Sequence, residues 1–209
     1  NKIDEIDVIE SGLSASLGVE YKKNKLNKDG TPGNEVFSFG LGQVVNDKEN
    51  EDMPSSSSLD QRFSDVVGQS KFYLENNKGE ISYNFALDQN YKDFNFNEID
   101  GNLVFGNTKF NMSYLEKKDH RGTEESFKSG IDIMVNDSGK LSFSTKRNLL
   151  TNSAEFYNLS YEYINDCLKA GIVFRREFYT DRDIEPDSSI MFTISILPFG
   201  EVNSPTLSK

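Results

Sequence analysis

Apolar and polar residues alternate along most of the chain with a period of two. In the segment from Gly12 to Tyr21, one side of an extended chain would carry Leu13, Ala15, Leu17, Val19 and Tyr21. The other side would carry Ser14, Ser16, Gly18 and Glu20. Successive side chains of a β-strand point to opposite faces, so this pattern predicts a strand. The same alternation predicts strands over residues 37–42, 81–88, 109–114, 157–163 and 189–196.

The length of the predicted strands favours a membrane-spanning sheet. With weaker segments included, the pattern predicts about eleven strands of about ten residues each, whereas strands of soluble sheets usually have about five or six residues. A tilted β-strand needs about nine to eleven residues to cross a bilayer, with one apolar and one polar face. A soluble β-sandwich also alternates, so the strand pattern alone leaves both folds open.

The lengths of the connections favour an outer-membrane barrel, which has short turns at one end and longer loops at the other. Long or intermediate connections are expected at 46–62, 88–93, 118–124, 149–153 and 179–187, and short ones at 76–79, 106–107, 136–139 and 164–166. Only the segment 24–34 breaks the series. If the short turns face the periplasm, the C-terminus and Cys167 lie there too.

We therefore expect an all-β fold, an antiparallel transmembrane β-barrel segment of about eleven meandering strands that is open on its own. The sequence contains no helix of consequence, internal repeat or domain linker. Residues 1–199 are predicted to form the barrel portion, and residues 200–209 a short C-terminal tail. The N-terminus has neither an initiating Met nor an apolar signal core, as expected of an internal piece of a longer chain.

Composition argues against two other classes of protein. The chain has 34 Asp and Glu against 23 Lys and Arg, a net charge of −11, and its basic residues are scattered. Nucleic acid is bound through clustered basic faces, so it is not an expected partner. No strictly apolar stretch exceeds three residues, whereas a transmembrane helix needs about twenty.

The sequence offers little for catalysis or metal binding. His120, the only histidine, lies in the charged segment 117–122, and we expect it to be a solvated loop residue. A serine hydrolase would have to use this histidine away from any strand serine. The acidic run Asp47–Asp52 lacks the regular ligand spacing of a calcium loop, and the single Cys167 has no Cys or His cluster for zinc. No catalytic residue, metal site or cofactor is predicted.

Two features of the C-terminal region leave alternatives open. Basic residues follow one predicted hairpin, namely Lys169, Arg175, Arg176 and Arg182. Guanidinium groups suit phosphates, such as those of lipids, but an arginine near the rim of a bilayer can also simply extend to water. Cys167 follows a short turn, where it is either bonded to another segment or chain in the oxidising periplasm or buried and inert.

Three stretches of the sequence carry a resemblance to a known family. They are Asp7–Gly12 leading into Leu17–Tyr21; Phe39–Gln43 followed by Pro54–Leu59 and Phe63–Gly68; and Asp166–Pro186 followed by Ile190–Leu197. Together they resemble the barrel of the LptD family, the outer-membrane lipopolysaccharide assembly proteins. The third stretch resembles the family's last hairpin and final strand.

The resemblance implies a barrel of about twenty-six strands, of which this chain would be the C-terminal eleven or so. Such a barrel takes lipopolysaccharide from a periplasmic bridge of LptA-like jellyroll domains and holds an LptE-like lipoprotein plug in its lumen. It inserts lipopolysaccharide into the outer leaflet through a lateral opening between its first and last strands. It performs no covalent chemistry, so we expect no enzyme. The expected location is the outer membrane of a Gram-negative bacterium, in contact with outer-membrane lipids.

The resemblance also points to individual residues. The last strand would form one side of the lateral gate through Ile190, Phe192, Ile194 and Ile196. Arg175, Arg176 and Arg182 are candidates for contacts with lipopolysaccharide phosphates. Cys167 matches the cysteines of a periplasmic turn that bond to the N-terminal jellyroll; many members have two adjacent cysteines, but here Leu168 follows, which leaves at most one such bond. The alternatives are a passive diffusion channel, a soluble all-β binding module and a hydrolase that uses His120.

Overall fold

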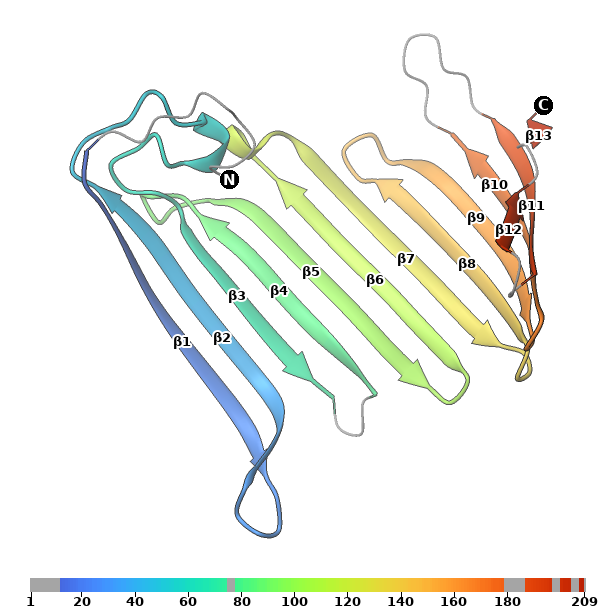
Figure 1. Ribbon diagram of the computed structural model, residues 1–209. Coiled ribbons are helices and arrows are strands. Elements are labelled where there is room, and N and C mark those ends of the chain that lie inside the picture. The colour runs from blue at the N-terminus through green and yellow to red at the C-terminus, as the bar shows by residue number, and fades with distance from the viewer. Residues whose placement is uncertain (1–11, 75–77, 179–186, 197–199, 204–206, 209) are drawn as a thin grey trace. The chain divides into compact units, whose positions relative to one another are not determined.

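A computed structural model describes residues 12–74, 78–178, 187–196, 200–203 and 207–208. Strands make up most of this part of the chain (Figure 1). They are β1 (Ser14–Leu26), β2 (Pro32–Asn46), β3 (Val66–Tyr73), β4 (Gly79–Leu87), β5 (Phe94–Phe105), β6 (Thr108–Lys117), β7 (Glu124–Met134), β8 (Gly139–Asn148), β9 (Ser153–Ile164), β10 (Leu168–Glu177), β11 (Ser188–Ile196), β12 (Gly200–Asn203) and β13 (Leu207–Ser208). The helical segments are the short 3-10 turns η1 (Ser55–Ser57) and η3 (Asp119–Arg121).

The order of the strands in the sheet follows their order in the chain from β1 to β12, and β13 pairs with β11. The registers of β1–β4 and of β7–β11 are antiparallel throughout. The prediction of an all-β antiparallel meander with about eleven main strands is therefore confirmed. The described helical segments include none that is long and apolar enough to cross a membrane.

The chain divides into two compact units, each described here by itself. Unit 1 comprises residues 1–100 and 114–125, and unit 2 comprises residues 101–113 and 126–209. Unit 1 thus holds β1–β4, residues 94–100 of β5 and residues 114–117 of β6. Unit 2 holds the rest of β5 and β6, most of β7, and β8–β13.

In unit 1 the β1–β2 hairpin extends well beyond the ends of β3 and β4 (Figure 1). Its strands have 13 and 15 residues, against 8 and 9 in β3 and β4. The turn itself is confined to residues 27–31, where Gly30 has a φ of +83° and the Asn27 N–H donates to the Thr31 carbonyl. The segment 24–34, which seemed to break the series of connections, is therefore mostly strand. The longest connections, 47–65, 88–93, 118–123 and 178–187, all follow even-numbered strands.

Burial in unit 1 is concentrated in and beneath the long connection 47–65. The buried residues there are Asn50, Met53, Ser58, Ser64, Asp65, Val66, Ala86 and Asn95. The apolar side chains of the strands are exposed instead, as with Leu17 at 65% and Phe72 at 51%. A soluble domain would cover such side chains, whereas a membrane sheet presents them to lipid.

Candidate functional site

The strands of unit 2 form a continuous apolar face. Residues directly opposite one another on neighbouring strands share a face of the sheet, and two rows of apolar residues cross β8–β11 in this way. The rows are Phe143, Leu159, Phe174 and Ile190, and beside them Leu141, Tyr161, Ile172 and Phe192. All eight are between 36% and 45% exposed. We call these eight residues the apolar face; its chemistry suits acyl chains.

The opposite side of the same strands is polar and carries a small charge network. Glu162 lies between two lysines, with its carboxylate oxygens 3.7 Å from Lys140 Nζ and 3.2 Å from Lys169 Nζ. Ser142 of β8 and Ser160 of β9 are directly opposite each other on this side, two residues along their strands from Lys140 and Glu162. The strands therefore separate an acyl-compatible face from a face that suits water, sugars and phosphate.

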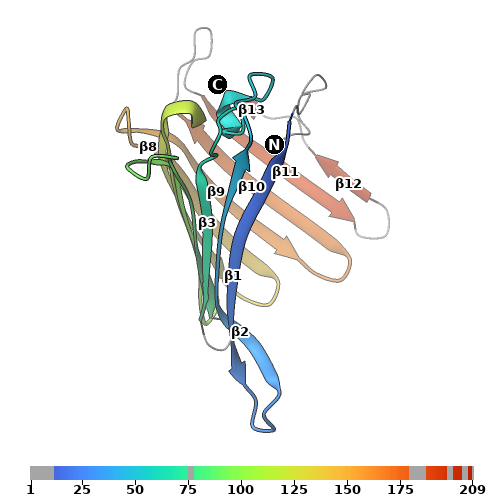
Figure 2. The same ribbon diagram turned by 90° about the vertical axis from the view of Figure 1, so that its left-hand side faces the viewer.

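The strand predicted to be last, β11, has partners on both sides. Ser188 to Ile196 pair with Arg176 to Leu168 of β10. On its other side, Thr193 to Ile196 pair with β12, and Ser189 and Ile190 pair with β13, as Figure 2 shows for β12. Residues 200–209, expected to be only a tail, thus contain two short strands. The sequence did not predict them because strands of four and two residues are too short to show a period.

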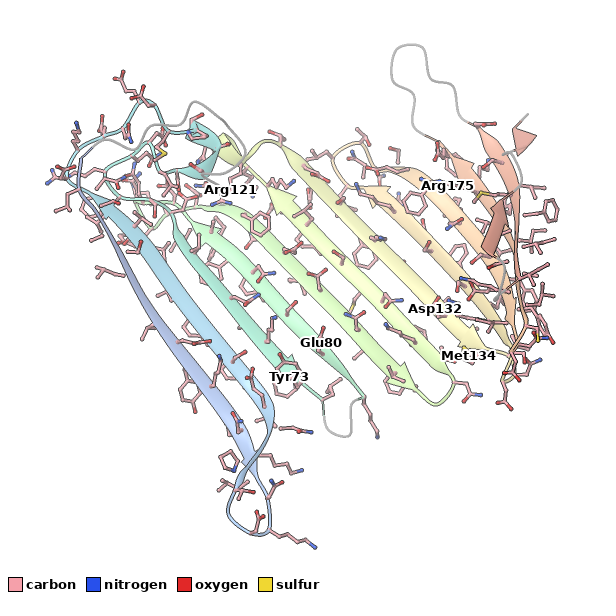
Figure 3. All side chains as sticks on the ribbon, viewed as in Figure 1. Tyr73, Glu80, Arg121, Asp132, Met134 and Arg175 are labelled. Carbon is pink, nitrogen blue, oxygen red and sulfur yellow. The ribbon has the colours of Figure 1, made fainter. Side chains whose placement is uncertain are left out.

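The two described arginines of the hairpin lie on different faces. Arg175 belongs to the polar side, where its Nε lies 2.7 Å from Glu177 Oε1 and its guanidinium 5.1 Å from the centre of the Phe156 ring. Figure 3 shows Arg175 near the C-terminal end of its strand. Arg176 is directly opposite Tyr157, and so lies on the apolar side. Arg182 lies outside the described residues.

Arg176 is embedded in an aromatic group at the end of β10. Its guanidinium lies 4.9 Å from the centre of the Phe178 ring, which meets the Tyr157 ring edge-on at 5.2 Å. A cation on an aromatic ring at the edge of an apolar face is typical of the bilayer interface. Both alternatives for Arg176, extension to water and contact with phosphate, stay compatible with this position.

Cys167 lies in the turn between β9 and β10 with its side chain exposed and its thiol free. Its N–H and that of Leu168 both donate to Asn165 Oδ1, at 3.0 and 2.8 Å. The alternative of a buried, inert cysteine is therefore wrong. The thiol is accessible to a partner outside these residues.

A buried charge cluster in unit 1 was not expected from the sequence. The side chain of Asp65 is fully buried, and its Oδ2 lies 3.0 Å from His120 Nε2 and 3.5 Å from Arg121 Nε. Asn95 Nδ2 donates to both carboxylate oxygens at 3.3 and 3.4 Å, and Ser58 Oγ accepts the Asp65 N–H at 2.9 Å. The cluster ties the connection 47–65 to the connection 118–123, and Arg121 is labelled there in Figure 3.

The prediction that His120 is a solvated loop residue is wrong, since its side chain is only 15% exposed. The local sequence is charged, and nothing in it shows that a carboxylate from a distant segment approaches the ring. The arrangement is not that of a serine hydrolase, because the ring faces a carboxylate and no serine hydroxyl bonds to it in the described part of the chain. Nor do the described residues bring together three or more His, Cys, Asp or Glu to hold a metal ion.

Comparison of the sequence with family models found a match over most of its length. The model described as "LptD: LPS transport system D" matches residues 1–166, which is most of the chain. The chain belongs to the LptD family. It is accordingly an outer-membrane β-barrel protein of Gram-negative bacteria, in a family that transports lipopolysaccharide. The soluble binding module is thereby ruled out.

The extent of the match bears on the candidate residues. The LptD match ends one residue before Cys167, so β11 and β10, with its Arg175 and Arg176, lie beyond it. The buried cluster of Asp65, His120 and Arg121 lies inside it. No curated protein matches the sequence significantly.

Solved structures similar to this LptD chain include porins at low identity. Two mutants of a porin from Rhodopseudomonas blastica are each 9% identical, over 93% of this chain and 89% of theirs, with TM-scores of 0.43 and 0.41. A structure described as "Asymmetric conductivity of engineered proteins" is 8% identical, over 98% of this chain and 92% of that one, with a TM-score of 0.42. At these TM-scores the likeness carries no argument about function.

Proposed function

We propose that this LptD chain inserts lipopolysaccharide into the outer leaflet through a lateral gate that includes β11. The acyl chains leave sideways into the membrane, while sugar and phosphate follow the polar side of the sheet. The observation that carries the proposal is the pair of opposed faces on β8–β11, an apolar face of eight residues on one side and the Lys140, Glu162 and Lys169 network on the other. The role needs no bond making or breaking, so the chain acts without catalysis.

The pairing of β11 supports its role in the gate. It pairs along its whole length with β10, but its other side meets only the short strands β12 and β13. A strand with few ladder bonds on one side can exchange that neighbour at lower cost than a fully paired one. The exposed fractions of Ile190, Phe192, Ile194 and Ile196 are 38%, 45%, 53% and 49%. These side chains would meet the acyl chains as they pass.

Contacts at the two ends of β10 complete the proposal. At one end, Arg176 and its aromatic neighbours lie where the phosphates of a lipopolysaccharide molecule would reach the membrane surface, and Arg175 and Arg182 belong to the same region of the chain. At the other end, the exposed Cys167 would form a disulfide with an N-terminal jellyroll domain. An LptE-like lipoprotein plug and an LptA-like periplasmic bridge are the expected partners.

Depletion of the full-length protein in its host tests the proposal. Lipopolysaccharide at the cell surface should fall, and lipopolysaccharide retained inside should rise. Re-expression of the wild-type chain is the control, and permeability to small solutes is measured alongside. Unchanged surface lipopolysaccharide together with reduced solute uptake would contradict the proposal and favour a passive channel.

A proline in β11 tests the gate more locally. Ile194 is opposite Ala170 of β10 and Val202 of β12, and Ile194→Pro removes its N–H from the ladder. Lipopolysaccharide transport should fall with Ile194→Pro and stay normal with Ile194→Val. If the proline variant assembles and transports as well as the wild type, β11 is not a gate strand.

A further inference from the structure

The β1–β2 hairpin carries a cluster of lysines beyond the end of the neighbouring strand β3. Residues 22–35 hold four lysines against one aspartate and one glutamate, a net charge of +2 in a chain whose net charge is −11. The last described pair between β2 and β3 joins Phe37 to Phe72, so β3 does not extend along residues 32–36 in the described part of the chain. Figure 1 shows this end of the hairpin projecting past β3 and β4. We call residues 22–35 the basic hairpin end.

Lys23 lies on the side of unit 1 that faces lipid. It is directly opposite Phe37 of β2, and the same row continues through Phe72 of β3 and Ile81 of β4. Tyr21, two residues before Lys23 on the same side, has its ring centre 6.3 Å from that of Phe37. A lysine among apolar side chains buries its stem along them and extends its ammonium to the membrane surface. Lys23 therefore marks one edge of the apolar band.

The length of the outward apolar run on β1 agrees with this edge. The run consists of Leu13, Ala15, Leu17, Val19 and Tyr21. Lys23 follows Leu13 by ten residues, which is about 34 Å of extended strand, or about 26 Å along the membrane normal at a tilt of about 40°. The apolar band of outer-membrane barrels is about 25 Å high. The residues after Lys23 therefore lie at the level of the lipid headgroups or just beyond it.

The connectivity of the strands places this end at the periplasmic leaflet. The turn 27–31 follows the odd-numbered strand β1, whereas the longest connections follow even-numbered strands. Outer-membrane barrels have their short turns at the periplasmic end. In an outer membrane that leaflet consists of phospholipids, a fraction of which are anionic, and clustered lysines are attracted to anionic headgroups.

The edges of the basic hairpin end are unsuited to a partner that adds a strand. Pro32 has no N–H to donate to a ladder, and the register between β1 and β2 shifts on both sides of Asn24. Prolines and bulges of this kind protect the edge of a sheet from further pairing. Recognition by charge is left, and it favours the lipid surface because Lys23 shares its face with lipid-facing side chains.

The lysines differ in how far they are already engaged. Lys22 lies on the polar side, with its Nζ 2.6 Å from Glu20 Oε1. Lys23 and Lys28 are both exposed. Asp29, the acidic neighbour of Lys28, accepts hydrogen bonds from the hydroxyl and the N–H of Thr31 through its Oδ1, so this oxygen is held within the turn.

We propose that the basic hairpin end binds anionic phospholipid headgroups of the periplasmic leaflet, with Lys23 and Lys28 as its main contacts. The inference goes beyond the proposed function, because it needs neither lipopolysaccharide nor a lateral gate. Binding at this level ties the hairpin to the membrane surface and sets the depth of β1 in the bilayer.

Photo-crosslinking in vesicles of defined composition tests the proposal. The full-length protein carries a photoreactive residue at Asn34, which is exposed near the turn, and is reconstituted with equal amounts of phosphatidylglycerol and phosphatidylcholine. Wild-type lysines should direct capture to phosphatidylglycerol. Lys23→Gln should lower this preference about fivefold, and Lys23→Gln with Lys28→Gln about twentyfold, as expected for one and two lysines near an anionic surface.

Two variants separate this charge effect from a general one. Lys71→Gln is the matched control, because Lys71 lies on the polar side of β3, opposite Ser38 and Ser82, and should leave the preference unchanged. Lys23→Arg keeps the charge and should keep the preference. Equal capture of both lipids by the wild type, or equal effects of Lys23→Gln and Lys71→Gln, would overturn the proposal.

The unmodified lysines are tested by ionic strength and in cells. Raising the salt concentration should lower the preference for phosphatidylglycerol, because exposed charges are screened, and a salt-independent preference would contradict recognition by charge. In cells, the photoreactive residue at Asn34 should capture phospholipid. A Lys23-dependent crosslink to a periplasmic protein in place of phospholipid would overturn the proposal and assign the basic hairpin end to an acidic protein partner.

Discussion

Asp65 Oδ2 and His120 Nε2 lie 3.0 Å apart although they belong to two different connections of unit 1. Asp65 ends the long connection before β3, and His120 lies in η3 after β6. Their approach, with Arg121 and Asn95 around the same carboxylate, fixes one connection against the other. Ser64 and Asp65 also line a hollow of about 450 Å³ beside the connection 47–65.

Removal of the buried carboxylate should loosen the connection 47–65. Asp65→Ala leaves the Asn95 amide without its acceptor, and the His120 ring and the Arg121 guanidinium without the carboxylate that they face, at a cost of about 3 kcal/mol. Limited proteolysis of the folded full-length protein should then cut this connection faster. His120→Ala should have a smaller effect, about 1 kcal/mol, because Arg121 and Asn95 keep the carboxylate satisfied. Equal protease resistance of Asp65→Ala and the wild type would contradict this account.

His120→Ala also separates transport from hydrolysis. A transport role predicts normal surface lipopolysaccharide in this variant, since the ring faces Asp65 and not a serine. A hydrolase that used the only histidine as its base would lose all function.

The alternation of residues along the strands was readable from the sequence, whereas the buried cluster was not. A period of two follows from the geometry of each strand alone, so Leu17, Val19 and Tyr21 could be assigned to one face without knowledge of any partner. The burial of His120 depends on Asp65, which reaches it only through the fold of two connections. The true length of the β1–β2 hairpin was missed for a related reason: Asn24 and Lys25 read as polar loop residues, but both continue a strand.

Gly68 lies beneath the ring of Phe85, and the strands need glycine there. The two residues are opposite each other on β3 and β4, and a Cβ at Gly68 would overlap the Phe85 ring. Gly68→Val should therefore lower stability by about 1–3 kcal/mol through overpacking. The folded fraction is measured by the heat-modifiable mobility of the full-length barrel on gels. Phe85→Ala in the same chain should recover part of the loss, because it frees the space; no recovery would show that the ring is not the cause.

The ion pairs of Glu162 should add little to the stability of the sheet, although its carboxylate separates the charges of two lysines. The side chains of Lys140, Glu162 and Lys169 are 40%, 32% and 39% exposed, so each ion pair contributes no more than about 1 kcal/mol. Glu162→Gln should change the heat-modifiable transition little at moderate salt. Glu162→Lys places a third cation beside the two lysines and should destabilise more at low than at high ionic strength. A salt-independent effect of Glu162→Lys would show that packing, and not charge, dominates there.

The tip of the β1–β2 hairpin should weaken in acid. Asp29 Oδ1 accepts hydrogen bonds from the Thr31 hydroxyl at 2.7 Å and from its N–H at 3.0 Å, and these bonds lower the pKa of Asp29. A lowered pKa in the folded turn means that the stabilisation is present above the pKa of the unfolded chain and is lost as the pH falls through the folded value. Protease nicking of 27–31 should therefore rise below about pH 4. Asp29→Asn should be nicked more readily at neutral pH and show less of this rise.

A reversible disulfide between β11 and β12 tests whether β11 must change its partner during export. Thr193 and Asn203 are directly opposite each other, and facing positions of antiparallel strands suit a disulfide. In a Cys167→Ser background, Thr193→Cys with Asn203→Cys should block lipopolysaccharide delivery when oxidised and restore it on reduction. The control pair, Ser144→Cys with Asn158→Cys, joins β8 to β9 and should leave delivery unchanged in both states. Normal delivery by the oxidised β11–β12 protein would mean that β12 stays in place, and that the lateral opening does not require this side of β11.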